Sequence, residues 1–137
     1  MFRQSEITVL GAKWYEHPQM LDFKKSVEKY YNEIDEFFSS LGYEHIKGTG
    51  SYKVTKPSDE RIALFAHEGF CLTFLSAVLD IPYPAVCMHF GMSHTGMTVI
   101  NFEEEDGYCV PRLLMLSSDS HLYKEWLPTR YYNEIQI

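Results

Sequence analysis

Cysteine, excess positive charge and long apolar runs are all scarce in this sequence. Its three cysteines are an odd number without CxxC spacing, so we expect neither a disulfide framework nor a zinc site, and a reducing compartment fits best. The formal net charge is -7, whereas a nucleic-acid-binding face has to be basic. No apolar run is long enough to cross a membrane, and the first residues show no signal-peptide pattern. We therefore expect a cytoplasmic protein with no nucleic-acid and no membrane partner.

The 137 residues are enough for one domain with one sizeable hydrophobic core. Apolar residues make up 45% of the chain, which indicates a globular rather than a disordered protein. No internal repeat, low-complexity segment or convincing domain boundary interrupts it, so we predict a single domain over residues 1–137. The six histidines show no HxxxH pair, and Glu103–Glu105 lacks the loop spacing of a calcium site. We expect no metal and no cofactor.

Hydrophobic periodicity predicts two helices. The first covers Met20–Leu41, where an aromatic-rich apolar stripe lies on one face and Gly42 is a good C-terminal stop. Core packing is the favoured interpretation of this stripe, and a partner surface is the alternative. The second helix covers Phe70–Leu79, where apolar residues again recur at helical spacing.

Turn signals predict two hairpins. Tyr43–Thr55 contains two short strand-like runs around a glycine-rich turn. Met97–Phe102 and Tyr108–Leu116 are strand-like and are joined through an Asp-Gly turn, a strong antiparallel hairpin signal. Pro111 inside the second of these strands indicates a sheet edge or a bulge there. Ile7–Leu10 is a further candidate for a short strand.

The stretch 61–80 organises the predicted fold. Ile62–Ala66 is a short apolar run after a polar loop, which is typical of a strand buried on both faces of a parallel sheet. His67, Glu68 and Gly69 interrupt this run, and helical spacing follows directly. We therefore predict a strand, a tight turn and a helix, with His67 at the sheet edge where ligands bind and the helix-start amides facing an anion. By residue type alone, a structural histidine at a strand end is the commoner case.

Three ordered segments resemble the histidine phosphatase superfamily, also called phosphoglycerate mutase-like. Ile62–Pro82, IALFAHEGFCLTFLSAVLDIP, resembles its second-histidine segment of apolar strand, His-x-Gly and apolar helix. Ser93–Val99 resembles the next segment, and Ser117–Leu122 the closing one. The similarity runs from about Leu21 to the end of the chain. It implies an α/β fold of the family's three-layer type, with a mostly parallel sheet and a carboxyl-terminal antiparallel hairpin.

The resemblance implies phosphoryl transfer through a phosphohistidine. In the family a nucleophilic histidine attacks the phosphoryl group, two arginines and a second histidine hold its oxygens, and an acidic residue protonates the leaving group. His67 matches the second histidine, which implies that it donates a hydrogen bond to a phosphoryl oxygen. The amides of Glu68 and Gly69 are candidate helpers, and His94 and Thr95 are candidates for the rim of the pocket. The partner implied is a small phosphorylated substrate or another oxyanion.

The family's nucleophile motif, Arg-His-Gly, does not occur, and the sequence holds no Arg-His pair. None of its four arginines stands in the family's arginine motifs. The chain therefore resembles the carboxyl-terminal half of the family fold, as a fragment, a truncated reading frame or a noncatalytic relative. Two functions stay open: a phosphatase-type hydrolase whose active unit includes an amino-terminal segment, with this chain inactive alone, or a noncatalytic phosphate-binding or assembly module on the same scaffold.

The resemblance also implies a missing neighbour for Ile62–Ala66. In the family the nucleophile strand pairs beside this one, so without it the strand edge would be open. We expect a homo-oligomer or swapped assembly that fills the gap, or else the absent amino-terminal segment in that place. The noncatalytic alternative predicts a closed monomer instead.

Overall fold

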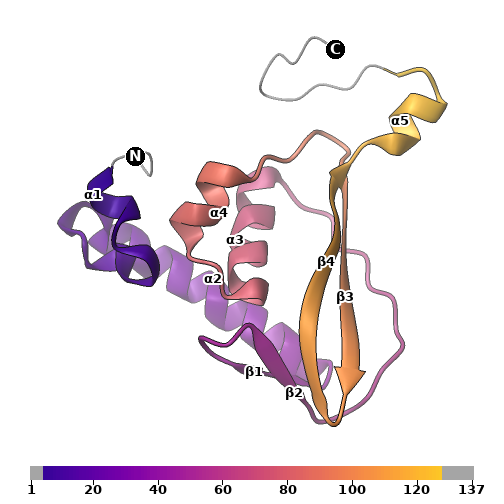
Figure 1. Ribbon diagram of the computed structural model, residues 1–137, viewed down its shortest axis with the longest axis horizontal. Coiled ribbons are helices and arrows are strands. Elements are labelled where there is room, and N and C mark those ends of the chain that lie inside the picture. Colours follow the sequence, from indigo (N-terminus) through magenta and orange to yellow (C-terminus); the bar gives the residue numbers. More distant parts are fainter. Residues whose placement is uncertain (1–4, 128–137) are drawn as a thin grey trace.

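The computed structural model describes residues 5–127 and is a mixed α/β structure (Figure 1). Helices α2, α3 and α4 gather on one side of an open four-stranded sheet (Figure 1). The elements, in chain order, are α1 (Ser5–Thr8), the 3-10 turns η1 (Gly11–Glu16) and η2 (Pro18–Met20), α2 (Leu21–Ser40), β1 (Tyr43–Ile46), β2 (Ser51–Val54), α3 (Glu68–Leu79), α4 (Tyr83–His89), β3 (Met97–Glu105), β4 (Tyr108–Ser118) and α5 (Ser120–Lys124).

The sheet has the strand order β1-β2-β4-β3, and each neighbouring pair is antiparallel. The predicted mostly parallel, three-layer arrangement is therefore not seen in residues 5–127. Both predicted hairpins are confirmed. Asp106 and Gly107 both have positive φ, the conformation that a tight two-residue hairpin turn requires. Pro111 lies outside the two β4 residues that pair with β2. Among the described residues, this part of β4 therefore has a neighbouring strand, β3, on one side alone, and such an edge position is where a strand tolerates proline.

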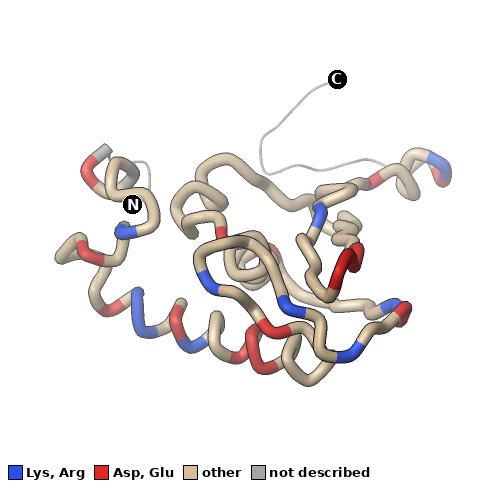
Figure 2. Tube along the Cα trace, turned by 60° about the horizontal axis from the view of Figure 1, so that its bottom comes forward, with Lys and Arg blue, Asp and Glu red and all other residues tan. Residues whose placement is uncertain are grey.

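The predicted first helix is confirmed, and its apolar stripe is only partly buried. Val27, Ile34 and Phe38 lie in the core, where the ring of Phe38 stacks on Phe102 with centroids 4.9 Å apart. Lysines and carboxylates both occur along the outer side of α2 (Figure 2), with Lys24 Nζ 3.4 Å from Glu28 Oε1. The stripe thus supplies core packing, as expected, while its margin stays at the surface: Phe23, Tyr30 and Phe37.

Gly42 ends this helix and allows a close approach of two chain segments. Its φ is +98, and a Cβ there would lie 2.6 Å from the carbonyl oxygen of Lys56. The amide and hydroxyl groups of Thr55 both donate to the Gly42 carbonyl, at 2.8 and 3.0 Å. The β1–β2 hairpin is thereby closed at its base beside the end of α2.

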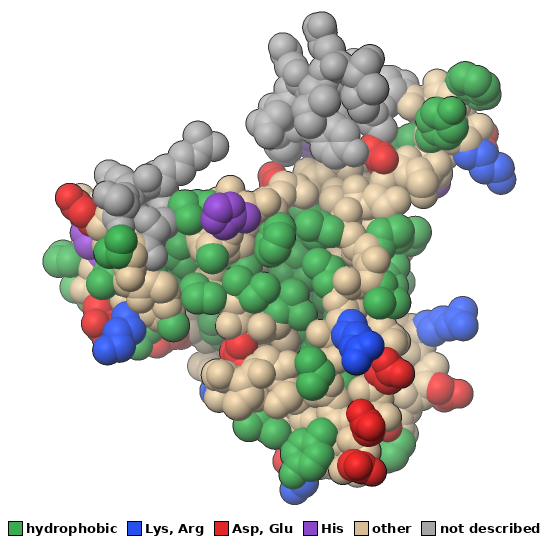
Figure 3. Space-filling model, viewed as in Figure 1, with side chains coloured by type: hydrophobic (Ala, Val, Ile, Leu, Met, Phe, Trp, Pro, Cys, Tyr) green, Lys and Arg blue, Asp and Glu red, His purple; other side chains and the backbone are tan. Residues whose placement is uncertain are grey.

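The second predicted helix, α3, begins two residues earlier than expected and supplies most of the remaining core. Leu75 and Val78 are almost fully buried, and Leu72 packs with Val86 of α4 against the inner face of β3 and β4. On the face seen in Figure 3, hydrophobic side chains gather over α3 and α4 and reach the neighbouring sheet. No helix in the described range has the length and apolarity needed to cross a bilayer.

The central prediction for Ile62–Ala66 is wrong. This segment forms no strand, and it lies at the surface, with Ile62 54%, Leu64 53% and Phe65 92% exposed. A short apolar run does not by itself distinguish a buried strand from an exposed loop, because burial depends on the segments that pack against it. His67 is therefore not at the end of a buried strand.

The candidate strand Ile7–Leu10 is also wrong, because α1 occupies Ser5–Thr8. Ile7 is fully buried against Trp14, Met20, Val27 and Tyr83, in a small cluster beside the start of α2. Four helical residues bury one large side chain here, and so short a helix leaves no periodic signal in the sequence.

Candidate functional site

The exposed side chain of His67 stands at the start of α3. Its backbone has extended φ and ψ (-93 and 159), and its side chain does not cap the helix. The first helical bond runs from the Cys71 amide to the His67 carbonyl at 3.0 Å. The amides of Glu68, Gly69 and Phe70 therefore have no acceptor within the helix, which is the arrangement that favours anions. No heavy atom would lie within 4 Å of a Cβ on Gly69, so the space on that side of the helix start is open.

The loop before β3 is tied to this same helix end. The Met92 amide donates to Glu68 Oε1 at 3.0 Å, so the Glu68 carboxylate is used to hold the loop. Deeper in the loop, the Ser93 amide donates to Ser117 Oγ at 2.6 Å. A Cβ on Gly96 would lie 2.5 Å from Ser117 Oγ, so only glycine fits there. These bonds hold the loop 92–96 between α3 and the end of β4.

The hydrogen bond between Glu68 and Met92 thus places the predicted site residues on two connected segments, and all of them except Glu68 are exposed. His94 and Thr95 are exposed on the tethered loop, and Thr95 has a φ of +60. His67 and Gly69 are exposed at the helix start, while Glu68 is half-buried. The Glu68 carboxylate accepts from the Met92 amide, which leaves the Glu68 amide, the group predicted to face the ligand, as its contribution to the site.

The cysteines near α3 are poorly suited to act as nucleophiles. Burial raises the pKa of the Cys71 thiol, and the nearby Glu68 carboxylate raises it further. Burial likewise raises the pKa of the Cys87 thiol. Since the thiolate is the reactive form, neither side chain is activated at neutral pH.

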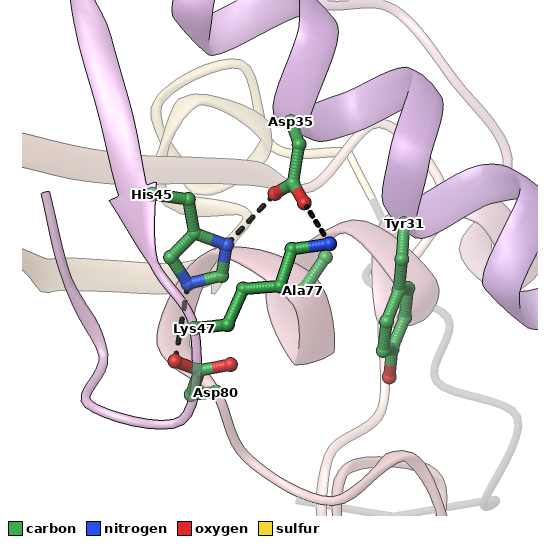
Figure 4. A pocket seen from close by; sticks show the side chains of 6 residues that line it. All are labelled: Tyr31, Asp35, His45, Lys47, Ala77 and Asp80. Atoms are coloured by element: carbon green, nitrogen blue, oxygen red, sulfur yellow. Dashed lines mark hydrogen bonds and ion pairs between the residues drawn. The ribbon is translucent and has the colours of Figure 1, made fainter.

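A second polar cluster, which the sequence did not reveal, surrounds His45 in β1 (Figure 4). The His45 side chain is 6% exposed and lies between two carboxylates: Nδ1 is 2.7 Å from Asp35 Oδ1, and Nε2 is 3.0 Å from Asp80 Oδ2. Lys47 Nζ lies 3.0 Å from the other oxygen of Asp35. Beside these groups is a cavity of about 60 Å³, which is also lined by Tyr31 and Ala77.

The His45 cluster joins elements rather than offering a reactive group. Both ring nitrogens of His45 lie within hydrogen-bonding distance of a carboxylate oxygen, so neither nitrogen is left open to a ligand. Asp80 has left-handed backbone geometry after α3 and also accepts from the Gly50 amide at 2.8 Å. Asp35 in α2, His45 in β1 and Asp80 after α3 therefore form a clamp across three elements. We call these three residues the histidine clamp.

A shallow depression of about 420 Å³ adjoins the clamp. Its carboxylates, Asp35, Glu36 and Glu44, outnumber its one lysine, Lys47, so a phosphate would be repelled there. Within residues 5–127, no group of three or more His, Cys, Asp or Glu side chains is arranged to hold a metal ion. The helix-start region at His67 is thus the better candidate for an oxyanion.

No protein-family model, curated protein or solved structure matches this chain.

Proposed function

We propose that this chain supplies the oxyanion-binding part of a phosphatase-type phosphoryl hydrolase of the histidine phosphatase superfamily. One observation supports the proposal most. The exposed side chain of His67 stands at the start of α3, beside three backbone amides that have no acceptor within the helix. A hydrogen bond from the Met92 amide to Glu68 ties the loop that carries His94 and Thr95 to this same helix end. The ligand proposed is a small phosphorylated compound, and the compartment proposed is the cytoplasm.

In this proposal each group contributes positioning and charge. His67 donates a hydrogen bond to a phosphoryl oxygen, and the amides of Glu68 and Gly69 donate along the axis of α3, whose N-terminal end carries partial positive charge. His94 and Thr95 face the ligand from the loop side. A phosphoryl group in transfer carries charge on its equatorial oxygens, so fixed donors of this kind stabilise it more than water does.

The nucleophile has to come from outside this set of residues. The sequence contains no Arg-His pair, and the thiols beside α3 are not activated. The antiparallel sheet would then be one part of the family's larger three-layer fold with its mostly parallel sheet. By this reasoning the 137-residue chain binds an oxyanion but does not turn over substrate alone.

A noncatalytic phosphate-binding or assembly module is the second candidate function. The exposed apolar segment Ile62–Ala66 favours it, since such surface in a soluble protein often marks an interaction site. Replacement of His67 distinguishes the two functions. If the chain is part of a hydrolase, the substitution lowers the turnover of the active unit that also contains the amino-terminal segment. A noncatalytic module has no turnover to lose.

Titration with inorganic phosphate followed by amide and imidazole NMR tests the site. We expect saturable shifts at His67, Glu68 and Gly69, and much smaller shifts in His67→Ala. His89→Ala is the matched control, because His89 is also exposed but lies at the C-terminal end of a helix, where anions are disfavoured. Absence of shifts at these residues in high phosphate would contradict the site.

An aryl phosphate assay tests the catalytic part separately. We expect no turnover by the purified 137-residue protein, because loss of a nucleophile lowers rates by orders of magnitude. Clear hydrolysis that disappears in His67→Ala would show that no further segment is needed.

A further inference from the structure

The surface segment before α3 has the properties of a strand that lacks its partner. We propose that two copies of this chain pair through residues Arg61–Ala66 as antiparallel β-strands, with the two-fold axis passing through Ala63. This inference does not depend on the proposed phosphoryl chemistry, because it rests on the backbone and side chains of the segment itself.

The segment is held at both ends. On one side, the Ser58 amide donates to Glu104 Oε1 at 3.3 Å, near the tip of the β3–β4 hairpin. On the other side, Glu68 accepts from the Met92 amide before β3 begins. The chain between these points runs along the outside of the sheet, beyond β3 (Figure 1). Its course is therefore set by two anchors, although it pairs with no described strand.

The backbone between the anchors is open to a partner. Across the described residues, Arg61–Ala66 makes no hydrogen bond through its amides or carbonyls, and none of its residues has a positive φ. The side chains of Ile62, Leu64 and Phe65 are largely exposed. Unsatisfied backbone groups beside exposed apolar side chains are what an added strand covers.

The symmetry of a dimer restricts the register. Side chains of directly opposed residues in an antiparallel pair point to the same face of the sheet, so their sequence numbers differ by an even number. A two-fold axis normal to the sheet relates the two strands. It therefore passes beside one central residue, which lies opposite the same residue of the other copy. Successive residues alternate between faces, so each candidate register is named by one central residue.

Side-chain complementarity selects Ala63 as that residue. With the axis there, Ile62 lies opposite Leu64 and Arg61 opposite Phe65, and each pair occurs twice. These are an apolar pair and a cation beside an aromatic ring, both favourable across strands.

The neighbouring registers are worse. An axis through Leu64 sets Ala63 against Phe65 and so removes the contact of Arg61 with that ring. An axis through Ile62 sets Leu64 against Glu60 and so removes the apolar pair. The partner that this surface fits is thus a second copy of the same segment.

Cysteine cross-linking tests the register. Opposed residues in an antiparallel pair have Cα atoms about 4.5–5.5 Å apart, within the range of a disulfide. We expect Ala63→Cys to form a covalent dimer under mild oxidation, seen on a non-reducing gel. A mixture of Ile62→Cys and Leu64→Cys should cross-link, and Ile62→Cys alone should not. The controls are the wild type, which keeps the three native cysteines, and Val9→Cys, a strongly exposed position in the amino-terminal region.

Sedimentation measures the association itself. We expect a concentration-dependent dimer of the 16.0 kDa chain, and a monomer for Leu64→Asp, which sets a carboxylate against Ile62 twice. Leu114→Asp, an equally exposed apolar position on β4, should leave the dimer intact. Far-UV circular dichroism should be unchanged in both variants, because both side chains are already at the surface.

Two results would overturn the proposal. One is a wild-type monomer throughout the micromolar range. The other is a dimer that Leu64→Asp leaves intact and that Ala63→Cys does not cross-link, since that dimer would use a different surface.

Discussion

The His45→Ala substitution tests whether the histidine clamp stabilises the fold. His45 connects α2, β1 and the end of α3 through its two ring nitrogens, and its ring also stacks on Tyr52 with centroids 4.6 Å apart. Truncation to alanine removes both contacts to carboxylates and the stacking together. At this point α2, β1 and the end of α3 would then be connected through Lys47, which contacts Asp35, and the Gly50 amide, which donates to Asp80.

The expected loss of stability depends on the hydrogen-bond partners that Asp35 and Asp80 keep after the substitution. Leaving a buried hydrogen-bonding group without its partner costs about 1–3 kcal/mol, and more when that group is charged, as a carboxylate is. Here Asp35 keeps Lys47 and Asp80 keeps the Gly50 amide, and the two side chains are 19% and 23% exposed. Two charge-assisted hydrogen bonds and one ring contact are lost, but solvent and these partners offset part of that. We expect a decrease of about 3 kcal/mol in the free energy of unfolding, roughly a hundredfold in the equilibrium constant.

Urea denaturation followed by far-UV circular dichroism measures this change. The transition midpoint should fall by about 1–3 M urea with an unchanged slope, since the surface exposed on unfolding stays the same. The matched control is His89→Ala, an exposed histidine, which should change stability by less than about 0.5 kcal/mol.

A double-mutant cycle with Asp80→Asn separates the contact from simple truncation. Asparagine tolerates the left-handed backbone at this position, so the substitution mainly removes charge. We expect a coupling energy of about 1 kcal/mol or more between residues 45 and 80. A loss in His45→Ala that is no larger than the control, or a coupling near zero, would refute the stabilising role of the clamp.

Two further predictions concern stability. Burial raises the pKa of Tyr83 to about 12 and that of Cys109 to about 11, above their usual values of 10.0 and 9.0. The folded chain holds the protons of Tyr83 and Cys109 more tightly than the unfolded chain does. The contribution of these two groups to stability should therefore be constant below about pH 9 and fall progressively toward about pH 12. Equal urea midpoints from about pH 9 to about pH 12 would contradict this. Gly42→Ala should lower the free energy of unfolding by more than about 2 kcal/mol, because it combines a left-handed φ with a backbone clash at Lys56. Gly91→Ala is the control and should be nearly neutral, since its Cβ would meet nothing within 4 Å. Equal melting midpoints for the two variants would contradict this prediction.

Local sequence signals predicted several elements well. The stripe ending at Gly42 predicted α2, and the Asp106–Gly107 turn predicted the β3–β4 hairpin, each within a few residues. Such elements are readable because their periodicity and turn geometry are set by neighbours three or four positions away. The same reasoning located the helix start near His67 as a candidate site element, whereas the loop with His94 was a candidate only through the family resemblance.

Contacts between distant segments could not be predicted in this way. The histidine clamp joins residues ten and thirty-five positions apart in sequence, and neither spacing corresponds to a helical or strand period. The hydrogen bond between the Met92 amide and the Glu68 carboxylate is of the same kind, and it gives that carboxylate a role in anchoring the loop that no local pattern indicated.

The sequence by itself determined helices α2 and α3, the hairpin turns and the presence of an apolar run before His67, because these depend on backbone geometry over short spans. Only the tertiary structure decided that Ile62–Ala66 lies at the surface, since burial of a strand depends on a neighbour that the run itself does not encode. It also decided the antiparallel strand order and the enclosure of His45 between two carboxylates. Both follow from how α2 and α3 pack on the sheet, and packing joins residues that no local pattern connects.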